Sequence, residues 1–187
     1  MFDADTFVAK CRDALRDPEP RRAMRDTLRE ALDRPGDVAT KLARPVGGLE
    51  LLFSSPTLTV LNVIWAPCMT IYPHDHRMWA LIGIYGGGED NTLFRRGPNG
   101  LTSSGGKALR EGDVFSLGAE AIHSVENPLR RFTGAIHVYG GDFVNQARSQ
   151  WDPDTFEEQP YDPEQVRSVF ADANAAWAAA GSPDGSS

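Results

Sequence analysis

Two of the chain's four histidines, His74 and His76, lie two residues apart in the stretch IYPHDHRMWALIGIYGG. In a β-strand, residues i and i+2 project from the same face, so the two imidazoles would lie side by side while Asp75 points the other way. Neutral imidazole is a common metal ligand, and such a pair could chelate one ion. Taken alone, a His-x-His pair can equally be a surface or turn feature that holds no metal.

The other two histidines favour the metal hypothesis. His123 lies in GDVFSLGAEAIHSVEN, near the start of a strand-like segment that follows a glycine turn. His137 lies in AIHVYGGD, on a later strand-like segment. All four histidines therefore fall in the β-rich part of the chain. The alternative is a set of core histidines whose nitrogens are satisfied by the backbone.

The elements that must position these histidines are short strands. From about residue 49 to 143, β-branched and apolar runs alternate with Gly, Pro, Asn and Asp, giving at least eight strand-like segments. The spacing leaves no room for the helical crossovers of a parallel sheet, so an all-β sandwich or barrel is predicted.

Helices are predicted on both sides of this core. Two amphipathic helices are expected within residues 1–36, interrupted at Pro20 and ended by RPGD; their apolar faces contain Phe7, Val8, Cys11 and Leu15, then Met24, Leu28 and Leu32. A C-terminal helix is expected over 162–180, with Asp162 as N-cap and Pro163 at the first helical position. Its apolar face contains Val166, Val169, Phe170, Ala173 and Trp177, and the following SPDGSS is expected to fray.

We therefore predict one domain over 1–187, with its β core at 45–145.

The composition and charge of the chain argue against some classes of binding partner. The 187 residues carry a net charge of −7 and have a pI near 5.1, which argues against a nucleic-acid-binding surface. The N-terminal MFDADTFVAK does not resemble a secretory signal, and no apolar run approaches a membrane span, so a cytoplasmic protein without membrane contact is expected. Cys11 and Cys68 are expected to remain reduced.

The histidine motifs resemble those of the cupin superfamily. His74 and His76 match the first cupin motif, and Gly112, His123 and Asn127 match the second at the right spacing. The glutamate of the first motif is absent, because Ala80 and Leu81 stand at the corresponding positions. The resemblance implies a double-stranded β-helix, or jelly-roll barrel, and a metal held by three histidines without a carboxylate.

The chain also resembles the cysteine dioxygenase family of thiol dioxygenases over roughly residues 45–155. The resemblance lies in the motifs PHDH and HVYGGD and in the N-terminal helices. This resemblance implies a mononuclear Fe(2+) site with His74, His76 and His123 as ligands, which adds both atoms of O2 to a substrate thiol and yields a sulfinate. His137 and Tyr139 match the family's Ser-x-His-x-Tyr relay as catalytic residues, although Ala135 stands at the serine position. The alternative for HVY is an ordinary core strand.

Three uncharged ligands would leave the metal its full 2+ charge, and a substrate thiolate would supply the missing anion. Imidazole also accepts zinc, copper or nickel, so the residues alone do not name the metal. Zinc in the same place would make a hydrolytic or structural site.

Two substrate-binding residues are predicted. Bacterial 3-mercaptopropionate dioxygenases carry an arginine after HVYGGD, and Arg148 in HVYGGDFVNQARSQWDP matches it. The planar guanidinium suits a carboxylate, so the expected substrate is a small thiol carboxylate resembling 3-mercaptopropionate or cysteine. Tyr72, two residues before His74, is expected to share the ligands' face. Arg148 could otherwise be a solvated loop residue.

Two other function classes remain open. One is another metal-dependent cupin enzyme, such as a dioxygenase that cleaves a carbon–carbon bond, or an isomerase. The other is a non-catalytic cupin that binds a metal or ligand. Formation of a sulfinate would distinguish the thiol dioxygenase from both.

Overall fold

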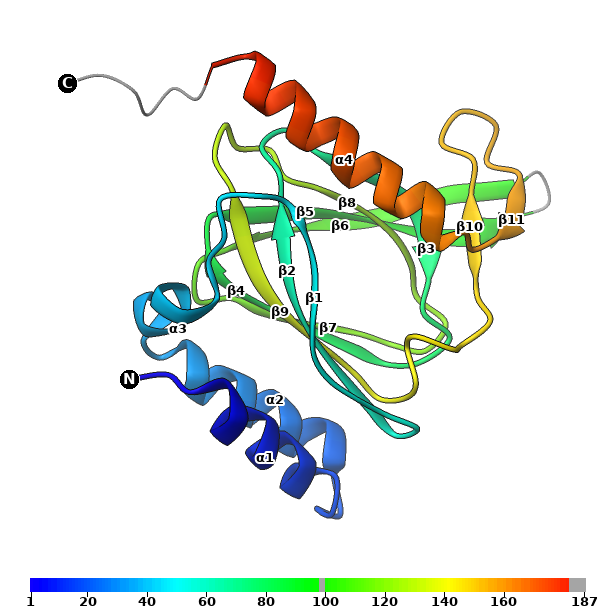
Figure 1. Ribbon diagram of the computed structural model, residues 1–187. Coiled ribbons are helices and arrows are strands. Elements are labelled where there is room, and N and C mark those ends of the chain that lie inside the picture. The colour runs from blue at the N-terminus through cyan, green and yellow to red at the C-terminus, as the bar shows by residue number, and fades with distance from the viewer. Residues whose placement is uncertain (98–99, 182–187) are drawn as a thin grey trace.

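The computed structural model describes residues 1–97 and 100–181, in which two antiparallel β-sheets face each other and four helices pack around them (Figure 1). One sheet has the strand order β1 (Gly48–Ser55), β2 (Leu58–Trp65), β9 (Thr133–Tyr139), β4 (Ala80–Gly86) and β7 (Val114–Leu117). The other has the order β11 (Glu158–Pro160), β10 (Ser149–Trp151), β3 (Thr70–Asp75), β8 (Ile122–Glu126), β5 (Gly88–Gly97) and β6 (Gly100–Arg110). The chain passes repeatedly between the two sheets, which is the topology of a jelly roll. The predicted all-β jelly roll with helices at both ends is confirmed.

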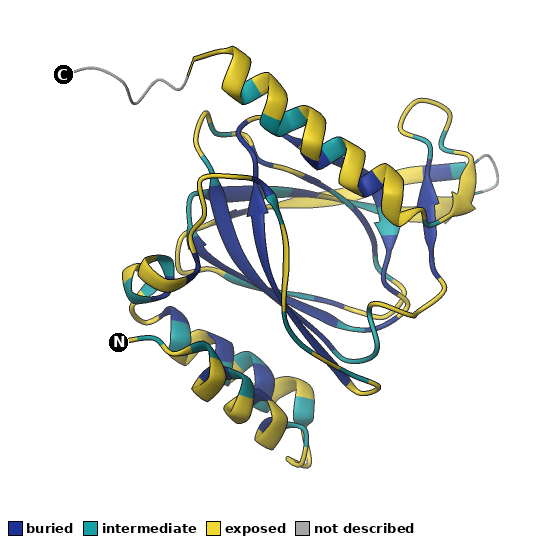
Figure 2. Cartoon of the chain, viewed as in Figure 1, coloured by how far each residue is buried: buried dark blue, intermediate teal, exposed yellow. Residues whose placement is uncertain are grey.

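The central strands β2, β4 and β9 are buried on both faces (Figure 2). In β2 the odd-numbered residues Leu61, Val63 and Trp65 join the core between the two sheets. The even-numbered residues Leu58, Val60 and Ile64 join a second core beneath the N-terminal helices. The two-residue period of a strand thus gives the barrel an inner and an outer apolar layer.

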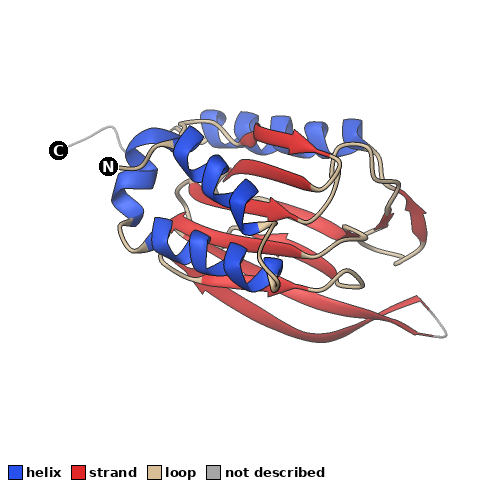
Figure 3. Cartoon of the chain, turned by 90° about the horizontal axis from the view of Figure 1, so that it is seen from below, coloured by secondary structure: helices blue, strands red, loops and turns tan. Residues whose placement is uncertain are grey.

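Three helices, and not the predicted two, cover the outer face of the five-stranded sheet (Figure 3): α1 (Ala4–Ala14), α2 (Pro20–Leu32) and α3 (Pro35–Leu42). RPGD does end the second predicted helix, because α2 stops at Leu32. The helical region nevertheless extends beyond residue 36, because Pro35 takes the first position of α3, where its fixed φ and missing N–H are tolerated. The predicted face of Met24, Leu28 and Leu32 is buried as expected.

The C-terminal helix α4 (Pro163–Ala179) crosses the barrel beside β1 and β3 (Figure 1). Asp162 caps it by accepting a hydrogen bond from Glu164 N, as predicted. Val166 and Phe170 are buried, and the Phe170 ring stacks on Trp65 with centroids 5.6 Å apart. The predicted fraying of SPDGSS concerns residues 182–187, which lie outside the described residues. No helix in the described residues is long and apolar enough to cross a membrane.

Candidate metal centre

The structure brings His74, His76 and His123 together inside the barrel. One ring nitrogen from each lies within 4.8 Å of the corresponding atoms of the other two. His74 on β3 pairs directly with His123 on β8, and His76 follows the end of β3. His76 Nε2 and His123 Nε2 are 3.3 Å apart, a separation that two nitrogen ligands about 2.0–2.1 Å from one ion can span. The geometry therefore suits a shared metal ion.

A bulge in β3 determines which side chains reach this cluster. Between the pairs Ile71–Val125 and His74–His123, β3 advances by three residues while β8 advances by two, so β3 contains one extra residue. The extra residue reverses the alternation upstream of His74. Ile71 consequently faces the histidines, and Tyr72 lies outside the lining of their chamber. The expectation that Tyr72 shares the ligands' face is wrong for this reason.

Hydrogen bonds orient two of the three imidazoles. His74 Nδ1 lies 3.0 Å from the carbonyl oxygen of Tyr72, so that nitrogen must carry the proton. His123 Nδ1 lies 2.7 Å from Asn91 Oδ1 and also donates. In both rings the Nε2 lone pair is left for a cation. His76 Nδ1 is buried and has no hydrogen-bond partner among the described residues, while its Nε2 faces His123.

Burial keeps the three imidazoles neutral. Desolvation lowers the pKa of His74 to about 4. Desolvation, followed by repulsion from neighbouring histidines, holds the pKa values of His76 and His123 well below their ordinary value. Neutral imidazole is the form that binds metals, so the cluster presents three uncharged donors at physiological pH.

His137 and Tyr139 form the wall opposite the ligands. They occupy alternate positions on β9, and both line the histidine chamber. Tyr139 Oη lies 3.0 Å from His137 Nδ1, and the Tyr139 ring meets the His76 ring edge-on with centroids 5.0 Å apart. Desolvation raises the pKa of Tyr139, so its hydroxyl stays protonated and available as a donor.

The chamber around the histidines is small and otherwise apolar. Its volume is about 40 Å³. Its remaining walls are aliphatic and aromatic: Leu49, Leu61, Val63, Trp65, Ile71, Val125, Phe143, Tyr161, Val166 and Phe170. Apolar walls exclude water and strengthen electrostatic interactions within the chamber. Buried neutral donors in such a chamber can bind a metal ion together with a small ligand.

No protein-family model matches the chain. Among solved structures, an RmlC-like cupin family protein from Methanocaldococcus jannaschii is 12% identical over 55% of this chain and 87% of that protein, with a TM-score of 0.47. A protein with a double-stranded β-helix domain from Klebsiella pneumoniae is 15% identical over 60% of this chain and 87% of its own, with a TM-score of 0.46. A deletion mutant of Bacillus subtilis oxalate decarboxylase is 16% identical over 57% of this chain but only 28% of that one, with a TM-score of 0.46. The strand order of the two sheets by itself defines the jelly roll.

Arg148 lies immediately before β10, beside the chamber and not within it. The residue is 9% exposed, so it is not a solvated loop residue. The guanidinium carbon lies 4.0 Å from the centroid of the Phe143 ring and 3.7 Å from that of Tyr161. Nη1 donates to the carbonyl oxygen of Phe143, and Nε is buried without a partner among the described residues. Arg148 therefore retains donor capacity beside the chamber.

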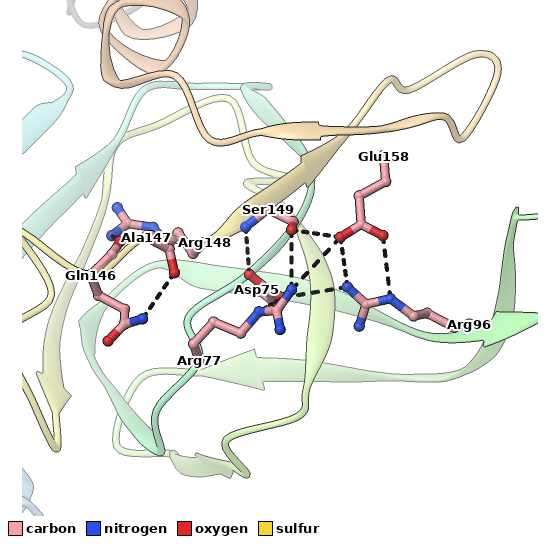
Figure 4. A network of polar contacts seen from close by, with 8 residues as sticks. All are labelled: Asp75, Arg77, Arg96, Gln146, Ala147, Arg148, Ser149 and Glu158. Atoms are coloured by element: carbon pink, nitrogen blue, oxygen red, sulfur yellow. Dashed lines mark hydrogen bonds and ion pairs between the residues drawn. The ribbon is translucent and has the colours of Figure 1, made fainter.

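Asp75 points away from the histidines, as the strand alternation predicts. Its carboxylate accepts hydrogen bonds from Ser149 N at 2.8 Å and pairs with Arg77 Nε at 2.6 Å (Figure 4). Glu158 and Arg96 extend this network across the sheet, and the Arg148 side chain lies apart from it (Figure 4). The network fixes β3 to β10 next to the ligand pair.

Sequence reasoning missed Glu89 and Asn91, which support the centre from β5. Glu89 is fully buried; it accepts hydrogen bonds from Trp65 Nε1 at 2.6 Å and Asn91 Nδ2 at 2.8 Å. One of its oxygens also lies 3.6 Å from His137 Nε2. The run GGGEDN resembles a turn, but β5 begins at Gly88, so Glu89 and Asn91 lie two residues apart on the same face of a strand. This two-residue spacing was the sequence feature that could have placed both side chains beside the histidines.

Proposed function

We propose that this chain is an iron(II)-dependent thiol dioxygenase that converts a thiol carboxylate and O2 into the corresponding sulfinate. The observation that carries the proposal is the convergence of three neutral imidazoles, with no carboxylate in the ligand group, in an apolar chamber. In the balanced reaction, RSH and O2 give RSO2H. The sulfur loses four electrons and both oxygen atoms accept them.

The ligand set suits an anionic substrate. Three neutral histidines cancel none of the charge of a divalent ion, so a thiolate gains more electrostatic stabilisation here than beside a carboxylate ligand. Bound iron(II) would supply thiolate binding and oxygen activation. His74, His76 and His123 would hold the ion, and the apolar walls would keep bulk water from the reacting sulfur.

His137 and Tyr139, on the wall opposite the ligands, would position and transfer protons during the reaction. The protonated Tyr139 hydroxyl can donate to an anionic oxygen of the substrate or product while the His137 ring orients it through Nδ1. Glu89 lies 3.6 Å from His137 Nε2, but that nitrogen has no hydrogen-bond partner among the described residues, so the carboxylate would act on the ring through its charge alone. The partner that the serine of the related relay would provide has no counterpart at Ala135.

The test combines metal analysis with oxygen uptake. The full chain is purified without air, its metals are quantified, and O2 consumption is followed with a panel of thiols including cysteine and 3-mercaptopropionate. We expect one iron per chain, one O2 consumed per thiol, and a product heavier by two oxygen atoms. His123→Ala should lose both metal and uptake.

Two results would reject the proposal. Stoichiometric zinc without O2 uptake would indicate a hydrolytic or structural site. O2 uptake without a sulfinate product would instead favour a dioxygenase of another class.

A further inference from the structure

A second, larger depression adjoins the histidine chamber. This groove has a volume of about 850 Å³ and runs between β1, the segment 143–148, the segment 160–163 and α4. It shares six lining residues with the chamber: Leu49, Leu61, Phe143, Tyr161, Val166 and Phe170. A molecule in the groove could therefore extend a reactive end to the histidines.

The groove presents apolar side chains to solvent. Leu49, Leu51 and Val144 are 44%, 53% and 58% exposed, and all three line the groove. They account for three of the five exposed large hydrophobic residues in the described part of the chain, the others being Met1 and Val46. A soluble domain seldom concentrates apolar exposure in one hollow unless something binds there.

The only charged side chains among the described residues of the lining are cationic. Arg148 lies at the junction of groove and chamber, where Phe143 and Tyr161, which line both, hold its guanidinium. Its buried Nε lacks a partner among the described residues, so a donor is available for an anion. Arg167 lies farther along the groove, where it pairs with Glu164. The groove is thus electrostatically complementary to an anion with an apolar body.

We propose that the substrate is a thiol carboxylate with a sizeable apolar substituent: the carboxylate binds Arg148, the thiol reaches the histidines, and the substituent fills the groove. This inference rests on the proposed function and names its substrate class. The chamber, at about 40 Å³, is small beside the groove of about 850 Å³. A molecule as small as 3-mercaptopropionate would leave most of the apolar lining in contact with water.

Carboxylates without a thiol test the groove separately from the reaction. Butyrate, hexanoate and octanoate are titrated into the full chain by calorimetry. Each buried methylene adds about fourfold to the affinity, so octanoate should bind far more tightly than butyrate. Arg148→Met should weaken all three acids by a similar factor.

Two α4 variants provide the steric test and its control. Ala171 lines the groove and is exposed, so Ala171→Trp should fill the hollow and weaken octanoate at least tenfold without affecting the fold. Ala176 is exposed and outside the lining, so Ala176→Trp should bind octanoate like the parent. Thermal melts of both variants check the fold.

Affinity that does not depend on chain length, or octanoate binding unchanged in Ala171→Trp, would overturn the inference. So would a stable dimer whose interface protects β1 and α4 from hydrogen exchange, because a second copy would then be the occupant. Failure of the thiol dioxygenase proposal looks different: the acids would bind as expected, but no thiol in the panel would yield a sulfinate.

Discussion

His123 and Asn91 are joined by a 2.7 Å hydrogen bond that fixes the direction of one of the three converging imidazoles. Asn91 cannot exchange its amide oxygen for its nitrogen, because Nδ2 donates to the Glu89 carboxylate at 2.8 Å. His123 Nδ1 must therefore carry a proton, and the Nε2 lone pair faces His76. No carboxylate belongs to the group of converging nitrogen atoms. The Glu89 carboxylate instead acts on His123 indirectly, through the amide of Asn91.

The first prediction concerns this chain of contacts. Glu89→Gln replaces an acceptor-only group by one with an N–H. Where this N–H faces Asn91, it removes the hydrogen bond that fixes the Asn91 amide and so loosens the His123 ring. Partners that orient metal ligands typically change metal affinity about 10–100-fold. We expect a loss in that range, measured by competition for Zn²⁺ with a chelator of known affinity.

Asp90→Asn is the matched control for Glu89→Gln. Asp90 neighbours Glu89 on β5 but pairs with Arg110 on the other face, and its side chain is 40% exposed. The same loss of one carboxylate charge should leave metal affinity unchanged there. Equal losses in the two variants would mean that Glu89 acts through net charge and does not orient His123.

The second prediction distinguishes the proposed metal ligand His123 from His137, which is proposed to act in proton transfer. His137 lies outside the group of converging ligand atoms, and its Nδ1 contacts Tyr139. His137→Gln should therefore retain the metal content of the parent while thiol oxidation slows about 10²–10⁴-fold, the usual contribution of a positioned proton-transfer group. His123→Ala should lose the metal. Metal per chain and initial rate, measured on the same samples, decide the assignment; loss of metal from His137→Gln would contradict it.

The convergence of His74, His76 and His123 was predictable because strand periodicity and motif spacing are local properties of the sequence. His137 and Tyr139 follow the two-residue alternation of β9, so their inward orientation was readable. Tyr72 was misplaced because a bulge depends on the pairing of β3 with β8, which no single segment reveals. The side-chain environment of Arg148 was hidden for a similar reason: Phe143 is close in sequence, but Tyr161 reaches it only through the path of the chain after β11.

A third prediction concerns the Asp75 network. Its carboxylate is 2% exposed, accepts from Ser149 N and pairs with Arg77, so Asp75→Asn removes a charge that two donors need. We expect a loss of about 1–3 kcal/mol in the free energy of unfolding, measured by urea denaturation. Metal content should persist, since the side chain points away from the histidines. Asp154→Asn, at an exposed turn, should change stability by less than about 0.5 kcal/mol.

The last prediction concerns the contact between α2 and β4. A Cβ added to Gly83 would lie 2.8 Å from Leu32 Cδ1 and 2.9 Å from Leu28 Cδ1, so an alanine there would have to displace two buried leucine side chains of the helix. Gly83→Ala should destabilise the fold by about 1–3 kcal/mol, whereas Gly86→Ala on the same strand meets no atom within 4 Å and should be nearly neutral.

Leu28→Ala should itself destabilise by about 2–5 kcal/mol through the cavity it leaves in a fully buried site. That cavity can accept the new methyl group, so the double variant should be more stable than the sum of the two single losses predicts. Urea denaturation of the four proteins in the cycle measures this coupling. Strict additivity would mean that the helix shifts to relieve the crowding, and that the glycine does not fix its position on the sheet.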